Sequence, residues 1–577
     1  MSEPLLKCSA NSHYQYYYSL FVILAQISKL VRKCMKYFDT LNFKNTFSIC
    51  FIAGIVLLFS SFVGFLVPAF REVMFFVVLL SVLILSIYKL EYGLFAALGE
   101  LVLGSKGYLL YFEADGTNVS LRIGIFLVVM GVFFSHLLIK KFKTIFYSPS
   151  EPRIITPDKS GVAIRGEPER RVEGSESNSL VPSPYKLFWF IPLFVLNILG
   201  FFHGLFRGFG FKDVFLDANG YFYLLYIFPF LAVFRDKEKS KRLTDVLLSS
   251  GFVLAIFSLF LFYIFSREWL NLDLIYKWQR VNLLSEITFT SGVYRIFAQS
   301  QIFLLVIFFL SLNYFFSTPS NLPLPRGGGG KVGEGYFSGE KFHLAIIASF
   351  FSLAAIFVSL SRSFFLGFLA GLFVFLFIVY LKNKKESLRI FFVVVLICFA
   401  SVAFLWTINK NEPRMLANRF LFASQGNNSS DPASLTRQEE LKPLFLEIIK
   451  KPFLGWGFGK TVEFLTHDPR ALNMLPQCVG KESCLYKTYA FEWGYLDLWL
   501  KLGLFGLVSL FGILYSLFKR GWSMIQAGNF SPAWILSSLV AVCITNIFTP
   551  YLNHPLGLGI LILITIYLFT ERFSRAS

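Results

Sequence analysis

Runs of about 20 apolar residues recur along this chain from Thr46 to Thr570, and they restrict the fold more than any other feature of the sequence. A helix of about 20 residues spans the roughly 30 Å hydrocarbon core of a bilayer. Of the 577 residues, 55% are hydrophobic and 15% are charged, and the mean hydropathy is +0.61. Soluble domains have about 25% charged residues. The sequence therefore predicts an all-α, polytopic membrane helix bundle.

About fourteen transmembrane helices are predicted, with both chain ends in the cytoplasm. They lie at residues 46–70, 73–89, 92–111, 121–138, 186–206, 218–234, 243–265, 294–316, 343–360, 364–381, 388–407, 494–518, 530–549 and 553–570. Because the first long apolar run begins well inside the chain, after a mixed and basic segment, we expect no cleavable signal peptide.

The net charge of +19 is explained in this prediction by basic residues in the cytoplasmic loops. Basic residues gather in five groups: Lys29, Arg32, Lys33, Lys36 and Lys44 before the first helix, Lys140, Lys141 and Lys143 after the fourth, Arg235, Lys237, Lys239, Lys241 and Arg242 after the sixth, Lys382, Lys384 and Lys385 after the tenth, and Lys519 and Arg520 after the twelfth. With fourteen helices and a cytoplasmic N-terminus, all five groups fall on the cytoplasmic side, as the positive-inside rule requires. The charge therefore indicates an inner-membrane protein and no nucleic-acid partner.

The predicted organisation alternates membrane regions with loops. A basic cytoplasmic segment (1–45) precedes the N-terminal helices (46–138), a disordered cytoplasmic loop (139–185), the central helices (186–407) with a Gly-rich cytoplasmic linker (317–342), a large periplasmic loop (408–493) and the C-terminal helices (494–577). The two cytoplasmic connections lack the large apolar residues that a folded core needs.

The large periplasmic loop contains a helix signal of its own. Thr436 and Glu439 have the spacing of a capping box, apolar residues follow at helical spacing, and Pro452 ends the pattern. Cys478 and Cys484 lie close together in the same loop, where an oxidising compartment would allow a disulfide; two free thiols are the alternative.

Four charged residues at the predicted external face are candidates for chemistry, because charge at the membrane boundary is costly. Arg295 is expected to open the eighth helix, and Arg362 lies in a short Ser-Arg-Ser turn between two helices. Arg437 lies in the first turn of the loop helix, where it opposes the helix dipole and suggests an anionic partner. Glu492 lies between Phe491 and Trp493, which should raise its pKa and suit a general base.

Each of these residues also has a structural explanation. For Arg295 the alternative is a contact with lipid headgroups, since arginines at helix ends extend to them. Arg362 can hold the turn and its two helices together, while Gly367 and Gly371 allow close helix packing. Arg437 can pair with Glu439 or Glu440 in solvent, and Glu492 can be an interfacial anchor in an aromatic belt.

A glycine-rich stretch, Gly455-Trp-Gly-Phe-Gly-Lys460, has only a superficial similarity to a nucleotide-binding loop, since no strand precedes it. We interpret it as a tight turn that directs Trp456 and Phe458 toward the membrane. Its backbone N–H groups and Lys460 could also bind a diphosphate, which makes Gly455, Gly457 and Lys460 candidates for substrate binding.

The order of motifs between about residues 290 and 520 adds a family resemblance. The Ser-Arg-Ser turn precedes the large loop, which contains Arg437 and Leu441 as Arg-x3-Leu, then Lys451-Pro-Phe-Leu-Gly-Trp-Gly457, and is followed by a Leu-Gly-Leu-Phe-Gly-Leu helix. This order resembles the O-antigen ligase and O-antigen polymerase superfamily of bacterial envelope glycosyltransferases. The family's His-x10-Gly motif falls on Glu492 and Gly503, so glutamate replaces the histidine, and its external arginine falls on Arg295.

The resemblance implies glycosyl transfer from an undecaprenyl-diphosphate-linked glycan to a glycan or lipid A-core acceptor at the periplasmic face. In that chemistry Arg295 and Arg437 bind the diphosphate and Glu492 accepts the proton of the acceptor hydroxyl; Arg362 can contact the donor. No cofactor is expected, and no cluster of acidic residues near the arginines demands a metal ion. A transporter or flippase of a lipid-linked glycan and a membrane scaffold are the alternatives; a transporter would favour charges buried in mid-helix and paired broken helices.

Overall fold

A computed structural model describes residues 43–114, 117–146, 188–290, 293–317, 339–409, 432–468, 472 and 478–570 of the chain. Its longer apolar helices are α2 (Phe43–Leu66), α3 (Pro68–Tyr88), α4 (Leu90–Leu103), α5 (Leu121–Phe146), α6 (Phe190–Phe206), α7 (Phe211–Phe222), α8 (Ile227–Val233), α9 (Lys237–Arg267), α11 (Ile302–Ser317), α12 (Gly339–Ser359), α13 (Arg362–Lys382), α14 (Lys384–Ile408), α18 (Gly494–Gln526), α19 (Ala533–Phe548) and α20 (Pro555–Thr570). Short 3-10 helices are η2 (Tyr223–Tyr226), η3 (Gln299–Gln301) and η5 (Tyr551–Asn553).

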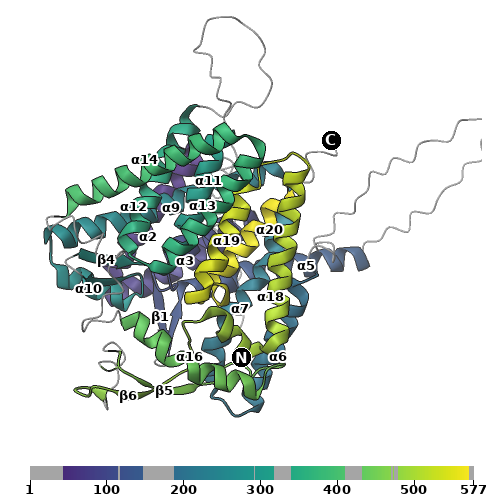
Figure 1. The fold of residues 1–577 in the computed structure, drawn as a ribbon. Coiled ribbons are helices and arrows are strands. Elements are labelled where there is room, and N and C mark those ends of the chain that lie inside the picture. The colour runs from purple at the N-terminus through teal and green to yellow at the C-terminus, as the bar shows by residue number, and fades with distance from the viewer. Residues whose placement is uncertain are drawn as a thin grey trace, which may run out of the picture.

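The remaining elements lie between these helices in the sequence. Two are the amphipathic helices α10 (Leu272–Val281) and α16 (Pro432–Lys450). The described residues also form antiparallel hairpins of β1 (Tyr111–Ala114) with β2 (Thr117–Ser120), β3 (Glu286–Thr290) with β4 (Val293–Phe297), and β5 (Val462–Thr466) with β6 (Cys484–Thr488). Figure 1 shows α16, β5 and β6 together at one end of the helix bundle.

The prediction of a polytopic helical membrane protein is confirmed. Every predicted range overlaps at least one helix, and eight helical segments of the described residues are long and apolar enough to cross a bilayer. Five further apolar helices are shorter. The span number of fourteen and the orientation stay predictions. The basic N-terminal segment, most of the loop 139–185, the Gly-rich part of the linker and residues 410–431 of the large loop lie outside the described residues.

Two predicted helix boundaries are wrong, and both errors hide a hairpin. The range 92–111 ends at Leu103, where Gly104 follows and the chain turns into β1. The range 294–316 begins as strand β4, and the helix starts only at Ile302. Val293 and Ile296 of this strand are buried, and β-branched and aromatic residues in such short segments favour strands. Arg295 therefore lies on a β-hairpin and does not open a helix.

The bundle has a buried centre and a lipid-facing rim. In the apolar window of α9, 72% of the residues are buried, compared with 22% in α3 and 28% in α14. Helices α13 and α19 pack closely: a Cβ atom on Gly367 would lie 2.7 Å from the carbonyl oxygen of Ala541, and one on Gly371 would lie 2.8 Å from that of Ser537. The predicted role of both glycines in close helix contact is confirmed.

Helix α18 is broken within its length at Gly503. The backbone of Gly503 has φ 68° and ψ −170°, which an L side chain rarely adopts. The break frees backbone groups that the preceding loop satisfies: the N–H groups of Trp456 and Gly457 donate to the carbonyls of Leu500 and Lys501 at 2.8 and 3.0 Å. The N–H of Leu504 in turn donates to the carbonyl of Pro452 at 2.8 Å. The loop and the broken helix therefore form one hydrogen-bonded unit.

Candidate functional site

The candidate site lies where α16 meets the start of α18. A terminal nitrogen of Arg437 lies 2.8 Å from Oε2 of Glu492, and its Nε donates to the carbonyl of Phe548 at 3.1 Å. The Arg437 and Glu492 side chains are 27% and 30% exposed, so the pair is accessible from one side. The indole N–H of Trp493 donates to the carbonyl of Arg437 at 2.9 Å. Two motif positions 55 residues apart in the sequence are thus in direct contact.

The predicted start of the loop helix is wrong. Helix α16 begins at Pro432, a residue favoured in the first turn, so Thr436 lies inside the helix and forms no capping box. The Thr436 hydroxyl instead donates to Asp468 at 2.6 Å, and the Glu439 carboxylate accepts from the backbone N–H of His467 at 3.1 Å. Arg437 therefore lies in the second turn, where the helix dipole has less influence. The predicted end before Pro452 is confirmed by Lys450.

A buried carboxyl group, Glu440, supports this pair and was missed in the sequence analysis as a site residue. Glu440 is 1% exposed, and its Oε1 accepts the backbone N–H of Glu492 at 2.8 Å. Burial raises the pKa of Glu440 to about 8, helped by the nearby carboxylates of Glu492 and Asp497 and opposed by the Glu492 N–H and by Arg437. Glu440 follows Arg437 by three residues on one helix face, which is the signal that could have identified it.

The raised pKa of Glu440 predicts a pH-dependent stability. In the folded protein the carboxyl keeps its proton up to about pH 8, whereas in the unfolded chain it loses the proton above its ordinary pKa of 4.5. Its contribution to the free energy of unfolding is therefore complete below pH 4.5 and is lost as the pH rises toward 8. Between pH 5.5 and 8 we expect wild type to lose about 3 kcal/mol more than Glu440→Gln, at about 1.4 kcal/mol per pKa unit. Thermal unfolding of the detergent-purified protein at both pH values measures this difference.

Glu463→Gln is the matched control for this experiment, since Glu463 is a half-exposed carboxylate on β5 paired with Lys487 at 2.9 Å. It should keep the wild-type loss of stability with pH. An equal pH dependence in Glu440→Gln and wild type would contradict the role assigned to Glu440.

Arg295 and Arg362 both lie at the Ser-Arg-Ser turn between α12 and α13. The Nε of Arg295 donates to the carbonyl of Ser359 at 3.0 Å, and its guanidinium lies 4.7 Å from the centre of the Phe297 ring. Arg362 is the first residue of α13 and is exposed, with no ion pair among the described residues. The expected role of Arg362 in holding the two helices together is therefore not seen; its side chain is directed to the surroundings.

The turn with the two arginines connects to the Arg437–Glu492 pair. The hydroxyls of Ser361 and Ser363 lie 3.0 Å apart, and that of Ser363 lies 3.3 Å from the hydroxyl of Thr549. Thr549 directly follows Phe548, whose carbonyl accepts from Arg437. A series of hydrogen bonds through the end of α19 thus links the Ser-Arg-Ser turn to the Arg437–Glu492 pair.

The glycine-rich turn at 455–460 has a structural role, because its backbone N–H groups bind other parts of the protein. The N–H groups of Gly455, Trp456, Gly457 and Phe458 donate to backbone carbonyls, and that of Gly459 donates to Asp217 at 2.8 Å. These N–H groups already donate hydrogen bonds within the protein, so they are not available to bind a diphosphate. The turn is tight, as interpreted from the sequence, but Phe458 is fully buried in the protein core and does not face the membrane. Lys460 pairs with Glu447 at 3.1 Å.

A buried charge network behind the turn was not identified from the sequence. The Nζ of Lys501 lies 2.5 Å from Asp217 and 2.6 Å from Asp497, and all three side chains are 4–5% exposed. The amide of Asn553 donates to Asp497 at 2.7 Å. The four-residue spacing of Asp497 and Lys501 in an apolar helix was the available signal, whereas the contribution of Asp217 comes from a distant segment.

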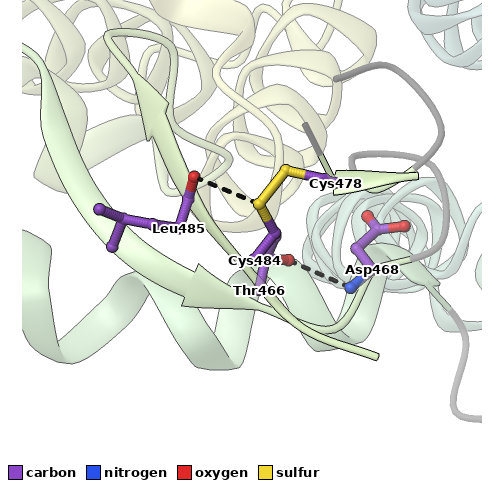
Figure 2. Close-up of a disulfide and its surroundings, with 5 residues drawn as sticks. All are labelled: Thr466, Asp468, Cys478, Cys484 and Leu485. Carbon is purple, nitrogen blue, oxygen red and sulfur yellow. Dashed lines mark hydrogen bonds between the residues drawn. A yellow bond between two sulfur atoms is a disulfide. The ribbon is translucent and has the colours of Figure 1, made fainter. Parts of the chain in front are cut away.

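Cys478 and Cys484 are joined by a disulfide, with their Cα atoms 5.6 Å apart, at the start of β6 (Figure 2). Just after the neighbouring strand β5, the backbone N–H of Asp468 donates to the hydroxyl of Thr466 at 3.1 Å. Because Asp468 also accepts from Thr436, the disulfide-bonded hairpin is attached to α16. This arrangement stabilises the helix that positions Arg437.

Among the described residues, no group of three or more His, Cys, Asp or Glu side chains is arranged to hold a metal ion. The site in the described part of the chain instead combines arginines with two carboxyl groups of different burial. Arginine binds phosphate groups through planar, often bidentate hydrogen bonds, and an accessible carboxylate can accept a proton. The fold and this site together define a polytopic membrane protein whose loop presents arginine and carboxyl side chains.

Part of the chain matches a known protein family. Residues 347–511, from α12 into α18, match the family model described as O-antigen ligase. This match agrees with the resemblance of residues 290–520 to the O-antigen ligase and O-antigen polymerase superfamily, whose members are glycosyltransferases. The matched segment contains Arg362, Arg437 and Glu492, whereas Arg295 precedes it. A comparison with curated proteins found no match.

Proposed function

We propose that this protein transfers a glycan from an undecaprenyl-diphosphate-linked donor to an acceptor hydroxyl at the periplasmic face of the bacterial inner membrane. The observation that supports this most directly is the 2.8 Å contact between Arg437 and Glu492, which puts an anion-binding group beside a proton acceptor. The family match agrees with this reaction class.

In the proposed reaction the acceptor oxygen forms a bond to the anomeric carbon of the donor glycan. The bond from that carbon to the diphosphate oxygen breaks, and undecaprenyl diphosphate leaves. Glu492 accepts the proton of the acceptor hydroxyl, while Arg437 stabilises the negative charge that develops on the diphosphate. Arg295 and Arg362 extend the positive charge along the turn. Because arginines compensate the diphosphate charge, we propose a reaction that needs no metal ion or cofactor.

Polymerisation of the glycan is the reaction we favour over ligation to a lipid A-core acceptor. The family histidine is replaced by Glu492, so the site departs from the ligase pattern at the proton acceptor. The broken helix and buried charges of α18 are features that a glycan transporter also has. Here both sides of the break bond to the loop at 452–459, which favours a structural origin of the break.

The test is complementation of a strain that lacks this protein, with the envelope glycan separated on a gel. Arg437→Ala should lower transfer by about 10²–10³-fold, as loss of one transition-state donor does. Loss of long chains with single capped units retained indicates a polymerase, and loss of all lipid-attached glycan with accumulation of the lipid-linked precursor indicates a ligase. Membrane abundance of the variant is measured in parallel.

Lys442→Ala is the matched control, since Lys442 is an exposed residue on the same helix. It should leave the glycan unchanged. A normal glycan in a well-expressed Arg437→Ala strain would contradict the proposed site and would favour the transporter.

A further inference from the structure

A second group of basic residues surrounds Trp456, away from the Arg437–Glu492 pair. Lys460 lies 4.3 Å, Lys451 4.6 Å and Arg207 5.0 Å from the centre of the indole ring. The ring is fixed, because its N–H donates to the carbonyl of Glu447 at 2.9 Å. Glu447 follows Arg437 by ten residues on α16, which is about 15 Å at 1.5 Å per residue. The cluster is therefore distinct from the candidate catalytic pair.

The charges of this cluster are not balanced within the described residues. The carboxylate of Glu447 pairs with Lys450 at 2.5 Å and with Lys460 at 3.1 Å. Lys451 and Arg207 have no ion pair with a carboxylate in the described part of the chain, and the Nε of Arg207 donates to His203 at 2.8 Å. Desolvation and the neighbouring Arg207 and Lys460 lower the pKa of Lys451. Four cations thus share one carboxylate, and an anion would complete the site.

The surroundings of the cluster are apolar and exposed. Phe453 and Leu454, in the same loop, are 60% and 65% exposed. Helix α6, which ends beside Arg207, presents a continuous exposed stripe at helical spacing, formed by Ile191, Val195, Leu199, Phe202 and Phe206. Such a stripe in a membrane helix faces acyl chains. The basic cluster is located at its end, where a lipid headgroup would lie.

We propose that the cluster of Arg207, Lys451 and Lys460 around Trp456 binds the phosphate of an anionic phospholipid, whose acyl chains lie along α6. Lys and Arg donate to the phosphate oxygens, and the indole holds the cations in place. The bound lipid would bridge α6 and the loop that follows α16. Two of these positions, Lys451 and Lys460, flank the glycine-rich turn, so lipid binding would also stabilise the unit of loop and broken helix.

The test is native mass spectrometry of the full-length protein purified in a neutral detergent. The protein is titrated with short-chain phosphatidylglycerol, with phosphatidylcholine of the same chain length, and with inorganic phosphate. We expect wild type to prefer phosphatidylglycerol. The double variant Lys451→Gln/Lys460→Gln should lower that preference by about 25-fold, at about a factor of five for each basic residue near an anionic lipid surface.

Lys277→Gln/Lys487→Gln is the matched control, since it removes two lysines that are 61% and 60% exposed at other sites. It should keep the wild-type preference. Because Lys460 pairs with Glu447, Arg207→Gln serves as a second variant that leaves this pair intact; it should also reduce the preference. Equal binding of both lipids by wild type, or an unchanged preference in both Trp456-site variants, would overturn the proposal. Displacement of phosphatidylglycerol by an equal concentration of inorganic phosphate would show a free-phosphate site and overturn the assignment to lipid.

Discussion

Glu492→Gln is expected to lower glycan transfer by about 10²–10⁴-fold, the usual contribution of a positioned general base. Glutamine has the size of glutamate and its amide oxygen can still accept from Arg437, but it cannot accept a proton from the acceptor hydroxyl. The variant should therefore fold and accumulate in the membrane as wild type does. The measurement is transfer from a lipid-linked glycan in membranes, together with the glycan pattern of the complemented strain.

Two comparisons separate this catalytic role from a structural one. Glu463→Gln changes an exposed carboxylate on β5 and should transfer glycan at the wild-type rate. Glu492→Asp retains the carboxylate with a shorter reach, so it should restore part of the activity that Glu492→Gln lacks. Wild-type activity in a well-expressed Glu492→Gln variant would show that another group accepts the proton.

Lys501→Met is expected to destabilise the protein by about 3–5 kcal/mol, because it leaves the carboxylates of Asp217 and Asp497 buried without their cation. Lys501 lies 2.5 and 2.6 Å from these carboxylates, and all three side chains are almost completely buried. Since Asp217 also accepts from the N–H of Gly459, the loop beside the broken helix should loosen with the network. Thermal unfolding in detergent and membrane abundance measure the loss.

The triple variant Asp217→Asn/Lys501→Met/Asp497→Asn distinguishes unpaired charge from lost packing. It removes all three charges while keeping the approximate side-chain volumes, so it should be more stable than Lys501→Met alone. Lys487→Met, which changes a 60% exposed lysine, should leave the unfolding temperature close to that of wild type. A triple variant as unstable as Lys501→Met would contradict the electrostatic explanation.

Much of the fold could be predicted because lipid imposes a simple rule on the sequence. Each membrane helix must form hydrogen bonds between its own backbone N–H and C=O groups and present apolar side chains to lipid. Its residues therefore form a long apolar run. The rule failed at β4 and after the end of α4, where apolar residues outside the helices add to the same hydropathy signal. It also gave no indication of the break at Gly503, since a broken helix remains apolar.

The candidate site was partly predictable. Arg437 and Glu492 were selected because charge at the membrane boundary needs a partner, and the structure shows that they are partners of each other. The sequence analysis placed Glu492 between two aromatic rings but did not select Glu440, the carboxyl group of this site that is 1% exposed. The position of Glu440 depends on how α16 packs against α18.

By itself the sequence determined the class of protein, most of the apolar helical ranges, the extra helix in the large loop and the resemblance to a glycosyltransferase superfamily. These features depend on local composition and on motif spacing, which the sequence gives directly without the three-dimensional structure. Only the tertiary structure decided which charges meet: Arg437 with Glu492, Lys501 with both Asp217 and Asp497, and Trp456 with its three cations. Coulombic and hydrogen-bond energies fall steeply with distance, and the distance between remote residues is set by packing of the whole bundle.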